Sequence, residues 1–171
     1  MNETEKNKLT VLWNAHSTSI LNLAFRFLQD RDEAEDVLMD LFVDLPKTLK
    51  KFRGDSSFST WFYRMTVNAC LMKIRKSKRH AELEAENHTS IAENLVGRFE
   101  ETSIFDAKLL EHGLSTLSPE TRSLLWLKDA EGLELKDLAE IFNLPEGTLK
   151  SKLSRARKTV REILKEEEIY A

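Results

Sequence analysis

The amino-acid sequence predicts an all-α protein with two small helical domains joined by an acidic linker. Apolar residues recur at helical spacing over most of the 171 residues, and no segment shows the alternation typical of a strand. Only five glycines and three prolines are present, which argues against a turn-rich β architecture. The predicted domains are residues 1–80 and 107–171. The linker at 81–106 holds seven acids and one base and is expected to be partly helical at best.

Three apolar stripes, at residues 9–27, 34–49 and 58–72, predict three helices in the N-terminal domain. Pro46 lies inside the second stripe and is expected to kink or split that helix. Between the second and third stripes, residues 52–59 form a Gly- and Ser-rich loop. One of its serines is expected to cap the third helix.

The C-terminal domain begins where helical periodicity returns after the linker. Ser118 is the expected N-cap of its second helix, with Pro119 at the first helical position and an end near Gly132. A short amphipathic helix at 135–142 follows, and Asn143 suits the left-handed position after it. The last helix carries a buried stripe, predicted as Leu149, Leu153, Ala156, Val160 and Ile163.

The last two helices have the layout of a helix-turn-helix, whose second helix enters the major groove of DNA. Arg155 can reach a guanine edge, while serines bind bases or phosphates and lysines bind phosphates. A solvated basic helix face is the alternative, but the preceding helix, with Ala139 at a close approach, favours DNA. One side of the last helix collects Lys150, Ser151, Ser154, Arg155 and Lys158.

A second basic segment, residues 61–80, has six Lys or Arg residues, no acid, and neighbouring aromatic residues. This combination suits single-stranded nucleic acid, whose unstacked bases rest on aromatic rings. Phe62 is predicted to be core, whereas Trp61 and Phe58 fit either role. Arg64, Asn68, Leu71 and Arg75 share a helix face, on which Asn68 is a candidate base reader.

Residues 29–44 are acidic, with seven acids and one base. Acids at a helix start favour the helix dipole, which explains those at 32–36. The dipole does not explain Asp40 or Asp44, nor the apolar Met39 and Val43 off the main stripe. These residues predict a face that docks on a protein partner.

The sequence favours neither an enzyme nor a metal or cofactor site. The four histidines are scattered and Cys70 is alone, so no metal-ligand spacing exists. No Gly-rich phosphate loop is present, and the carboxylates lie in polar clusters rather than in an apolar pocket. No apolar run is long enough to span a membrane and no signal peptide is apparent, so we expect a cytoplasmic protein without a membrane segment.

Three segments in this order resemble bacterial RNA polymerase sigma factors of the sigma-70 family, in the extracytoplasmic-function (ECF) group. They are "AEDVLMDLF", "FRGDSSFSTWFYRMTVNACLMKIRK" and "LSTLSPETRSLLWLKDAEGLELKDLAEIFNLPEGTLKSKLSRARKTV". The resemblance covers nearly the whole chain except the linker and the tail. The sequence departs from common features of the group at Met39, Pro46 and Ser154, where a Gln, a Trp and a bulky side chain are frequent.

The resemblance implies an N-terminal domain that binds core RNA polymerase and the minus-ten promoter element, and a C-terminal domain that binds the minus-thirty-five element as duplex. It implies that the linker occupies the RNA exit path of the polymerase. An anti-sigma protein often holds members of this group inactive, although no residue here identifies one. The implied polymerase contacts are Asp36, Met39, Asp40 and Val43. The implied minus-ten contacts are Phe52, Arg53, Asp55, Ser56, Phe58, Trp61, Arg64, Asn68 and Arg75. The implied minus-thirty-five contacts are Thr148, Lys150, Ser151, Lys152, Ser154, Arg155, Arg157 and Lys158.

Two other classes of protein compete with a sigma factor. A free-standing helix-turn-helix repressor with an N-terminal dimerisation domain has little use for the aromatic, basic segment at 61–80. A helical interaction protein that binds no DNA does not explain why residues 61–80 and 148–161 each collect six bases and no acid.

Overall fold

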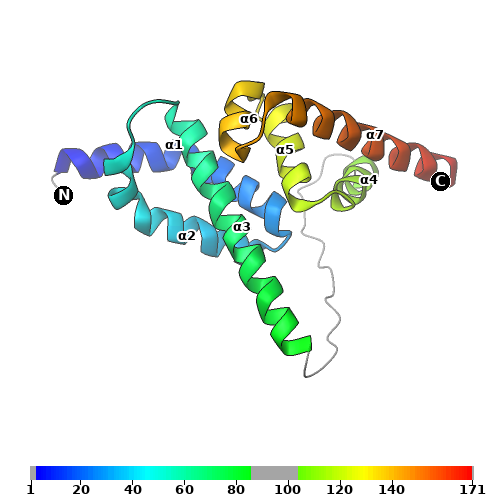
Figure 1. The fold of residues 1–171 in the computed structure, drawn as a ribbon, viewed down its shortest axis with the longest axis horizontal. Coiled ribbons are helices and arrows are strands. Elements are labelled where there is room, and N and C mark those ends of the chain that lie inside the picture. Colours follow the sequence, from blue (N-terminus) through cyan, green and yellow to red (C-terminus); the bar gives the residue numbers. More distant parts are fainter. Residues whose placement is uncertain (1–2, 86–103, 171) are drawn as a thin grey trace. The chain divides into compact units, whose positions relative to one another are not determined.

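The computed structural model describes residues 3–85 and 104–170, in which all regular structure is helical (Figure 1). The chain divides into two compact units, Met1–Val96 and Gly97–Ala171. The predicted linker lies mostly outside the described residues, and only its ends, 81–85 and 104–106, belong to described helices. No described helix is both long and apolar enough to cross a membrane.

The N-terminal unit consists of α1 (Glu3–Leu28), α2 (Arg31–Thr48), a 3₁₀ turn η1 (Leu49–Lys51) and α3 (Phe58–Ala85). Helix α1 packs against both α2 and α3. Phe62 is fully buried, as predicted. Other buried residues of this core are Ile20, Leu23, Phe27, Val37, Leu41, Leu45 and Val67.

Of the two outcomes expected at Pro46, a kink or a split, the split is wrong, because α2 continues through Pro46 to Thr48. A proline lacks the N–H that would bond the carbonyl four residues earlier. Here that carbonyl belongs to Phe42, which lies on the exposed side of α2. The last turn is stabilised by the Thr48 hydroxyl, which donates to the carbonyl of Asp44 at 2.9 Å.

Helix α3 is capped as expected but buries a different face from the predicted one. Ser57 Oγ accepts a hydrogen bond from the backbone N–H of Thr60 at 3.1 Å. Met72, at the end of the predicted stripe, is 68% exposed. The buried stripe instead contains Thr66, whose hydroxyl donates to the Phe62 carbonyl at 2.9 Å. A polar residue whose hydroxyl bonds a carbonyl of its own helix can be buried. The buried face of the helix then differs from the face that the apolar residues alone predict.

Cys70, the chain's one cysteine, lies on this buried face. Burial raises the pKa of its thiol to about 12. The thiol is therefore protonated at neutral pH and is a poor nucleophile in the folded unit.

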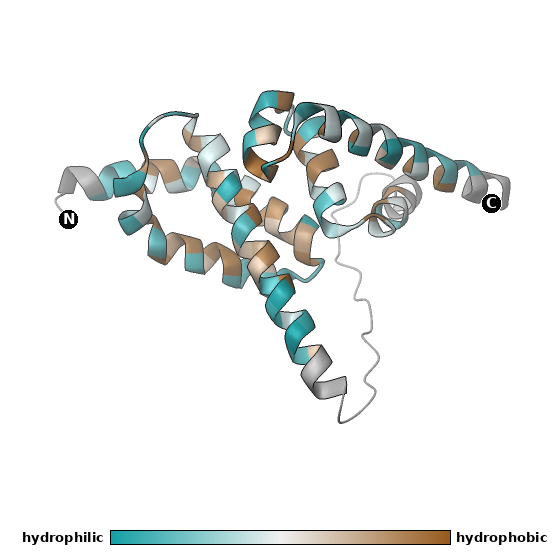
Figure 2. Cartoon of the chain, in the orientation of Figure 1, coloured by the Kyte–Doolittle hydropathy of each residue, from teal (hydrophilic) through white to brown (hydrophobic). Residues whose placement is uncertain are grey.

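The C-terminal unit consists of α4 (Ile104–Ser115), α5 (Pro119–Asp129), α6 (Leu135–Phe142) and α7 (Glu146–Tyr170). Helix α7 contacts the other three helices, and Figure 2 shows its hydrophilic outer edge. The core contains Leu124, Leu127, Leu138, Leu149, Leu153 and Val160.

The predicted capping residues at the helix ends of this unit are confirmed. Ser118 Oγ accepts from the N–H of Thr121 at 3.3 Å, and Pro119 is the first residue of α5. Asn143 is left-handed after α6, with φ 52° and ψ 47°. These features depend on a few adjacent residues, so the sequence alone reveals them.

Arg122 is a buried cation in α5 that binds the end of α4. Its side chain is only 5% exposed. Its Nε donates to the carbonyl of Leu114 at 3.0 Å, and its Nη2 donates to the carbonyl of Leu117 at 2.9 Å. The last carbonyls of a helix have no partner within the helix. Arg122 therefore adds a donor from a neighbouring helix to the carbonyl of Leu114, which also accepts from the Leu117 N–H at 3.1 Å, and it binds the turn that follows α4 through Leu117.

Candidate nucleic-acid interface

The outer side of α7 presents the polar and basic residues that the helical period predicts. Leu149, Leu153 and Ala156 face the core, which leaves the opposite side of the helix to solvent. The exposed residues there are Thr148, Lys150, Ser151, Ser154, Arg155 and Lys158. This side has a positive charge and several hydrogen-bond donors, as major-groove readout requires.

Within this face, the side chain of Arg155 lies along its own helix. Its Nε donates to the carbonyl of Ser151 at 3.2 Å, and the Ser151 hydroxyl donates to the carbonyl of Gly147 at 3.1 Å. Lys158 is 3.7 Å from Glu162, an exposed pair within α7 that is weak in water. These contacts are local, so Arg155 and Ser151 can exchange them for a ligand without disturbing the core.

The structure does not place Arg157 and Lys152 with the other predicted minus-thirty-five residues. Arg157 donates from Nε and Nη2 to both carboxylate oxygens of Asp129, at 3.1 and 2.6 Å. This pairing raises the pKa of Arg157. Lys152 is half-buried, with Nζ 4.0 Å from Glu120 Oε1. Both residues therefore face α5, which carries Asp129 and Glu120.

In the N-terminal unit, an exposed face of α3 contains Arg64, Asn68 and Arg75, as predicted. The exposed Met72 lies on the same side by the helical period. Sequence reasoning missed Met72, because an apolar residue at helical spacing was assigned to the core. The face thus combines cationic, amide and apolar groups, each of which has a use against unstacked bases.

The aromatic residues beside this face form one connected cluster. The Phe52 ring centroid is 5.1 Å from that of Trp61, and Phe58 is 5.5 Å from Trp61 and 5.4 Å from Phe62. Phe52, Phe58 and Trp61 are half-buried. These rings therefore pack against one another and keep part of their surface accessible.

The loop between η1 and α3 is fixed at both ends and polar at its tip. Gly54 has φ 77°, a left-handed conformation that glycine adopts without strain. Arg53 and Asp55, on either side of it, are exposed, and Ser56 is half-buried. The loop therefore presents charged groups from a defined turn, next to the aromatic cluster.

His16 of α1 supports the cluster, since its ring centroid is 5.2 Å from that of Phe58. Burial lowers the pKa of His16, because desolvation disfavours the charged imidazolium.

Acid should therefore destabilise the N-terminal unit through His16. Below the ordinary histidine pKa of about 6.5, the unfolded chain binds a proton at His16 more readily than the folded unit does. The free energy of unfolding therefore decreases as the pH is lowered. We expect a smaller fall between pH 7.5 and 5.5 in His16→Gln than in the unchanged protein, measured by urea unfolding. Equal falls would show that His16 does not contribute.

The outward side of α2 presents apolar side chains among acids. Met39, Phe42 and Val43 are 56, 45 and 64% exposed. Asp36 and Asp40 are also exposed. Together these residues form the face that the sequence predicts for docking on a protein partner. Apolar side chains grouped on one helix face with a charged rim are typical of a protein–protein interface.

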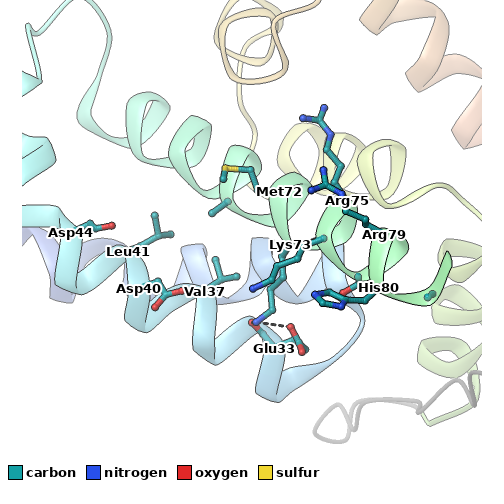
Figure 3. A pocket seen from close by; sticks show the side chains of 14 residues that line it. Glu33, Val37, Asp40, Leu41, Asp44, Met72, Lys73, Arg75, Arg79 and His80 are labelled. Atoms are coloured by element: carbon teal, nitrogen blue, oxygen red, sulfur yellow. Dashed lines mark hydrogen bonds and ion pairs between the residues drawn. The ribbon is translucent and has the colours of Figure 1, made fainter. Parts of the chain in front are cut away.

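Beside the outward side of α2, a groove of about 990 Å³ runs between α2 and the basic part of α3 (Figure 3). Asp40 and Asp44 line its α2 wall, while Arg75 and Arg79 line its α3 wall. At one end Lys73 of α3 forms an ion pair with Glu33 and lies 3.4 Å from Asp36 Oδ2. The groove is thus lined by one predicted polymerase-binding residue, Asp40, and one predicted minus-ten residue, Arg75, and Lys73 holds the two helices together.

Comparison with known families identifies both units. The model of sigma-70 region 2 matches residues 12–80, and that of sigma-70 region 4 matches residues 107–160. The chain therefore belongs to the sigma-70 family of transcription initiation factors. Within that family its relatives are sigma factors of the ECF group, as the resemblance implied.

Two curated relatives illustrate this group. The chain is 29% identical to the ECF RNA polymerase sigma factor SigM of Mycobacterium tuberculosis, over 90% of this chain and 75% of that protein. It is 27% identical to the ECF RNA polymerase sigma factor SigW of Bacillus subtilis, over 88% of this chain and 86% of that protein.

Solved structures share the fold. The sigma factor RpoE, in complex with the anti-sigma factor NepR from Bartonella quintana, matches with a TM-score of 0.76 at 22% identity, covering 92% of this chain and 97% of that one. CnrH, in complex with the cytosolic domain of CnrY, matches with a TM-score of 0.67 at 18% identity, covering 94% and 89%.

Proposed function

We propose that this sigma factor divides promoter-directed initiation among three surfaces. The outward side of α2 binds core RNA polymerase, the loop at 52–57 and the exposed face of α3 bind the minus-ten element, and the outer side of α7 binds the minus-thirty-five element. The observation that carries the proposal is the pair of exposed basic helix faces, one in each unit. The half-buried aromatic cluster beside only the first of them supports the proposal, since stacking surfaces suit a melted strand.

The minus-thirty-five surface acts as a duplex reader. The N-terminal half of a recognition helix lies deepest in the major groove, where Ser151 and Arg155 reach base edges. Lys150 and Lys158 contact phosphates and fix the register of the helix. Both basic side chains are exposed, so neither loses a buried interaction on binding DNA.

Net charge explains why such a protein acts on the polymerase. The whole chain has a formal net charge of -3, although both DNA-facing surfaces are basic. Because non-specific DNA affinity is mainly electrostatic, the free chain binds DNA weakly. Docking on core polymerase, which acts in the cytoplasm, supplies the affinity that the chain lacks. By analogy with the solved RpoE, which is bound to an anti-sigma factor, the chain is also a target for an anti-sigma protein.

Run-off transcription tests the proposal as a whole. Core polymerase is incubated with promoter fragments, with and without the chain, and transcripts are measured. New transcripts that require the chain support the proposal. Tight duplex binding by the free chain without any transcription would instead favour the repressor.

Replacement of Arg155 by alanine should relax one minus-thirty-five position. One good base contact contributes about 1–3 kcal/mol, so promoter output falls at the preferred sequence and the other bases at that position become tolerated. Transcription from a library randomised in the minus-thirty-five element measures this change. Arg161→Ala, six residues further along the same helix, is the control. An unaltered preference in Arg155→Ala would remove Arg155 as a reader.

Replacement of Asn68 by alanine should impair promoter opening more than closed-complex binding. Asn68 is exposed on the face assigned to the melted strand and has no place in duplex recognition. Permanganate footprinting of unpaired thymines reports opening, and gel shift of the holoenzyme at low temperature reports closed-complex binding. Asn22→Ala, an exposed asparagine on α1, is the matched control. Equal loss in both assays would contradict the assignment.

A further inference from the structure

We propose that Arg157 is a positioning residue of the minus-thirty-five surface, and that it acts by binding Asp129 rather than DNA. This inference rests on the proposed function of α7. It replaces the DNA contact that the sequence resemblance implies for Arg157, and it gives a role to Asp129.

The geometry of the pair is specific. Asp129 is the last residue of α5, and Arg157 lies 28 residues later in α7. Two guanidinium nitrogens bind the two carboxylate oxygens, at 3.1 and 2.6 Å. A planar guanidinium that binds a carboxylate with two parallel hydrogen bonds fixes direction as well as distance.

Asp129 stands at an unfavourable place for an acid. The C-terminal end of a helix carries partial negative charge, which a carboxylate in the last turn opposes. Lys128, the neighbouring cation, donates its Nζ to the carbonyl of Leu133 at 2.8 Å. Arg157 therefore supplies a compensating positive charge. The ion pair with α7 explains why Asp129 is present despite its unfavourable interaction with the helix dipole.

The ion pair between Arg157 and Asp129 fixes the rotation of α7 about its own axis. Buried residues such as Leu149 and Leu153 hold α7 against the unit, but apolar contacts are not directional. A rotation of about 20° moves groups at the helix surface, roughly 5–6 Å from the axis, by about 2 Å. Such a shift breaks a hydrogen bond to a base edge, because hydrogen bonds weaken steeply outside their narrow range of distance. Asp129 thus determines where Arg155 and Ser151 meet the DNA.

The pair is half-exposed, with side chains 43 and 46% accessible, so it contributes little to global stability. A phosphate contact and a positioning role of Arg157 then predict opposite effects of neutralising Asp129 on the affinity for DNA. If Arg157 bound phosphate, neutralising Asp129 would free it and tighten DNA binding. If Arg157 positions α7, neutralising Asp129 weakens binding, although the protein becomes less negative.

The experiment uses holoenzyme assembled from core polymerase and the full chain, with promoter affinity measured over a series of salt concentrations. Arg157→Gln and Asp129→Asn should each weaken promoter binding about three- to tenfold, and the double variant should be no weaker than either. The exchange Asp129→Arg with Arg157→Asp should recover part of the loss. The salt dependence should stay unchanged, since no phosphate contact is lost.

Glu162→Gln is the matched control, because it removes the acidic partner of Lys158 and makes the same change in charge as Asp129→Asn. It should not weaken promoter binding. A salt slope reduced by about one in Arg157→Gln, together with tighter binding by Asp129→Asn, would overturn the proposal. Unchanged binding in both single variants would overturn it too. Failure of the unchanged holoenzyme to recognise any promoter would instead count against the function assigned to α7.

Discussion

Replacement of Arg122 by methionine will lower the free energy of unfolding of the C-terminal unit by about 3 kcal/mol. Methionine keeps an unbranched side chain in the buried site but donates no hydrogen bond. The carbonyl of Leu117 then loses its side-chain donor, and that of Leu114 keeps only the backbone N–H of Leu117. Hydrogen bonds from a charged donor contribute about 1.5–3 kcal/mol each, so the loss of both is large for a single substitution.

Segment-resolved hydrogen exchange of the full chain measures this loss. Amides of α4 and α5 should exchange faster in Arg122→Met, while those of the N-terminal unit stay protected. The Cys70 thiol is an independent check, because its reaction with a thiol reagent requires opening of that unit. Arg161→Met changes an exposed arginine in the same way and should have little effect. If the α4 amides of Arg122→Met exchange as slowly as those of the unchanged protein, the hydrogen bonds of Arg122 are dispensable for stability.

The sequence predicted best the features that adjacent residues decide. The caps at Ser57 and Ser118, and the left-handed Asn143, require only a side chain and the next few backbone groups. The exposed side of α7 follows in the same way from its buried leucines at helical spacing. The division of α7 into an exposed side and a buried side was thus readable from periodicity.

Features that depend on distant residues were not predictable in this way. Arg122 and Arg157 are two arginines in helices, and only the folded unit shows that one binds the end of α4 and the other binds Asp129. An acid in the last turn of a helix was the one available signal for Asp129. Met72 was misassigned because two overlapping faces of α3 both have helical spacing, and the buried Thr66 counts as polar in any pattern.

Replacement of Met39 by aspartate will lower the affinity for core polymerase by about 3 kcal/mol, or roughly a hundredfold, without unfolding the chain. Met39 is 56% exposed, so the folded unit loses little packing. In a docked complex the same position becomes desolvated, and a carboxylate placed there has no partner. It also adds to the negative charge of Asp36 and Asp40, on the same helix.

Val11→Asp is the matched control for this prediction. Val11 is 68% exposed on α1 and has no role in the proposed polymerase surface, so the same apolar-to-acid change should leave polymerase binding intact. Affinity is measured by titration of labelled chain with core polymerase, and unfolding in urea checks that both variants are folded. Equal weakening by both substitutions would mean that net charge, rather than the α2 surface, controls binding. Strong binding by Met39→Asp would place the polymerase contact elsewhere, and the exposed apolar side chains of α2 would then need another partner.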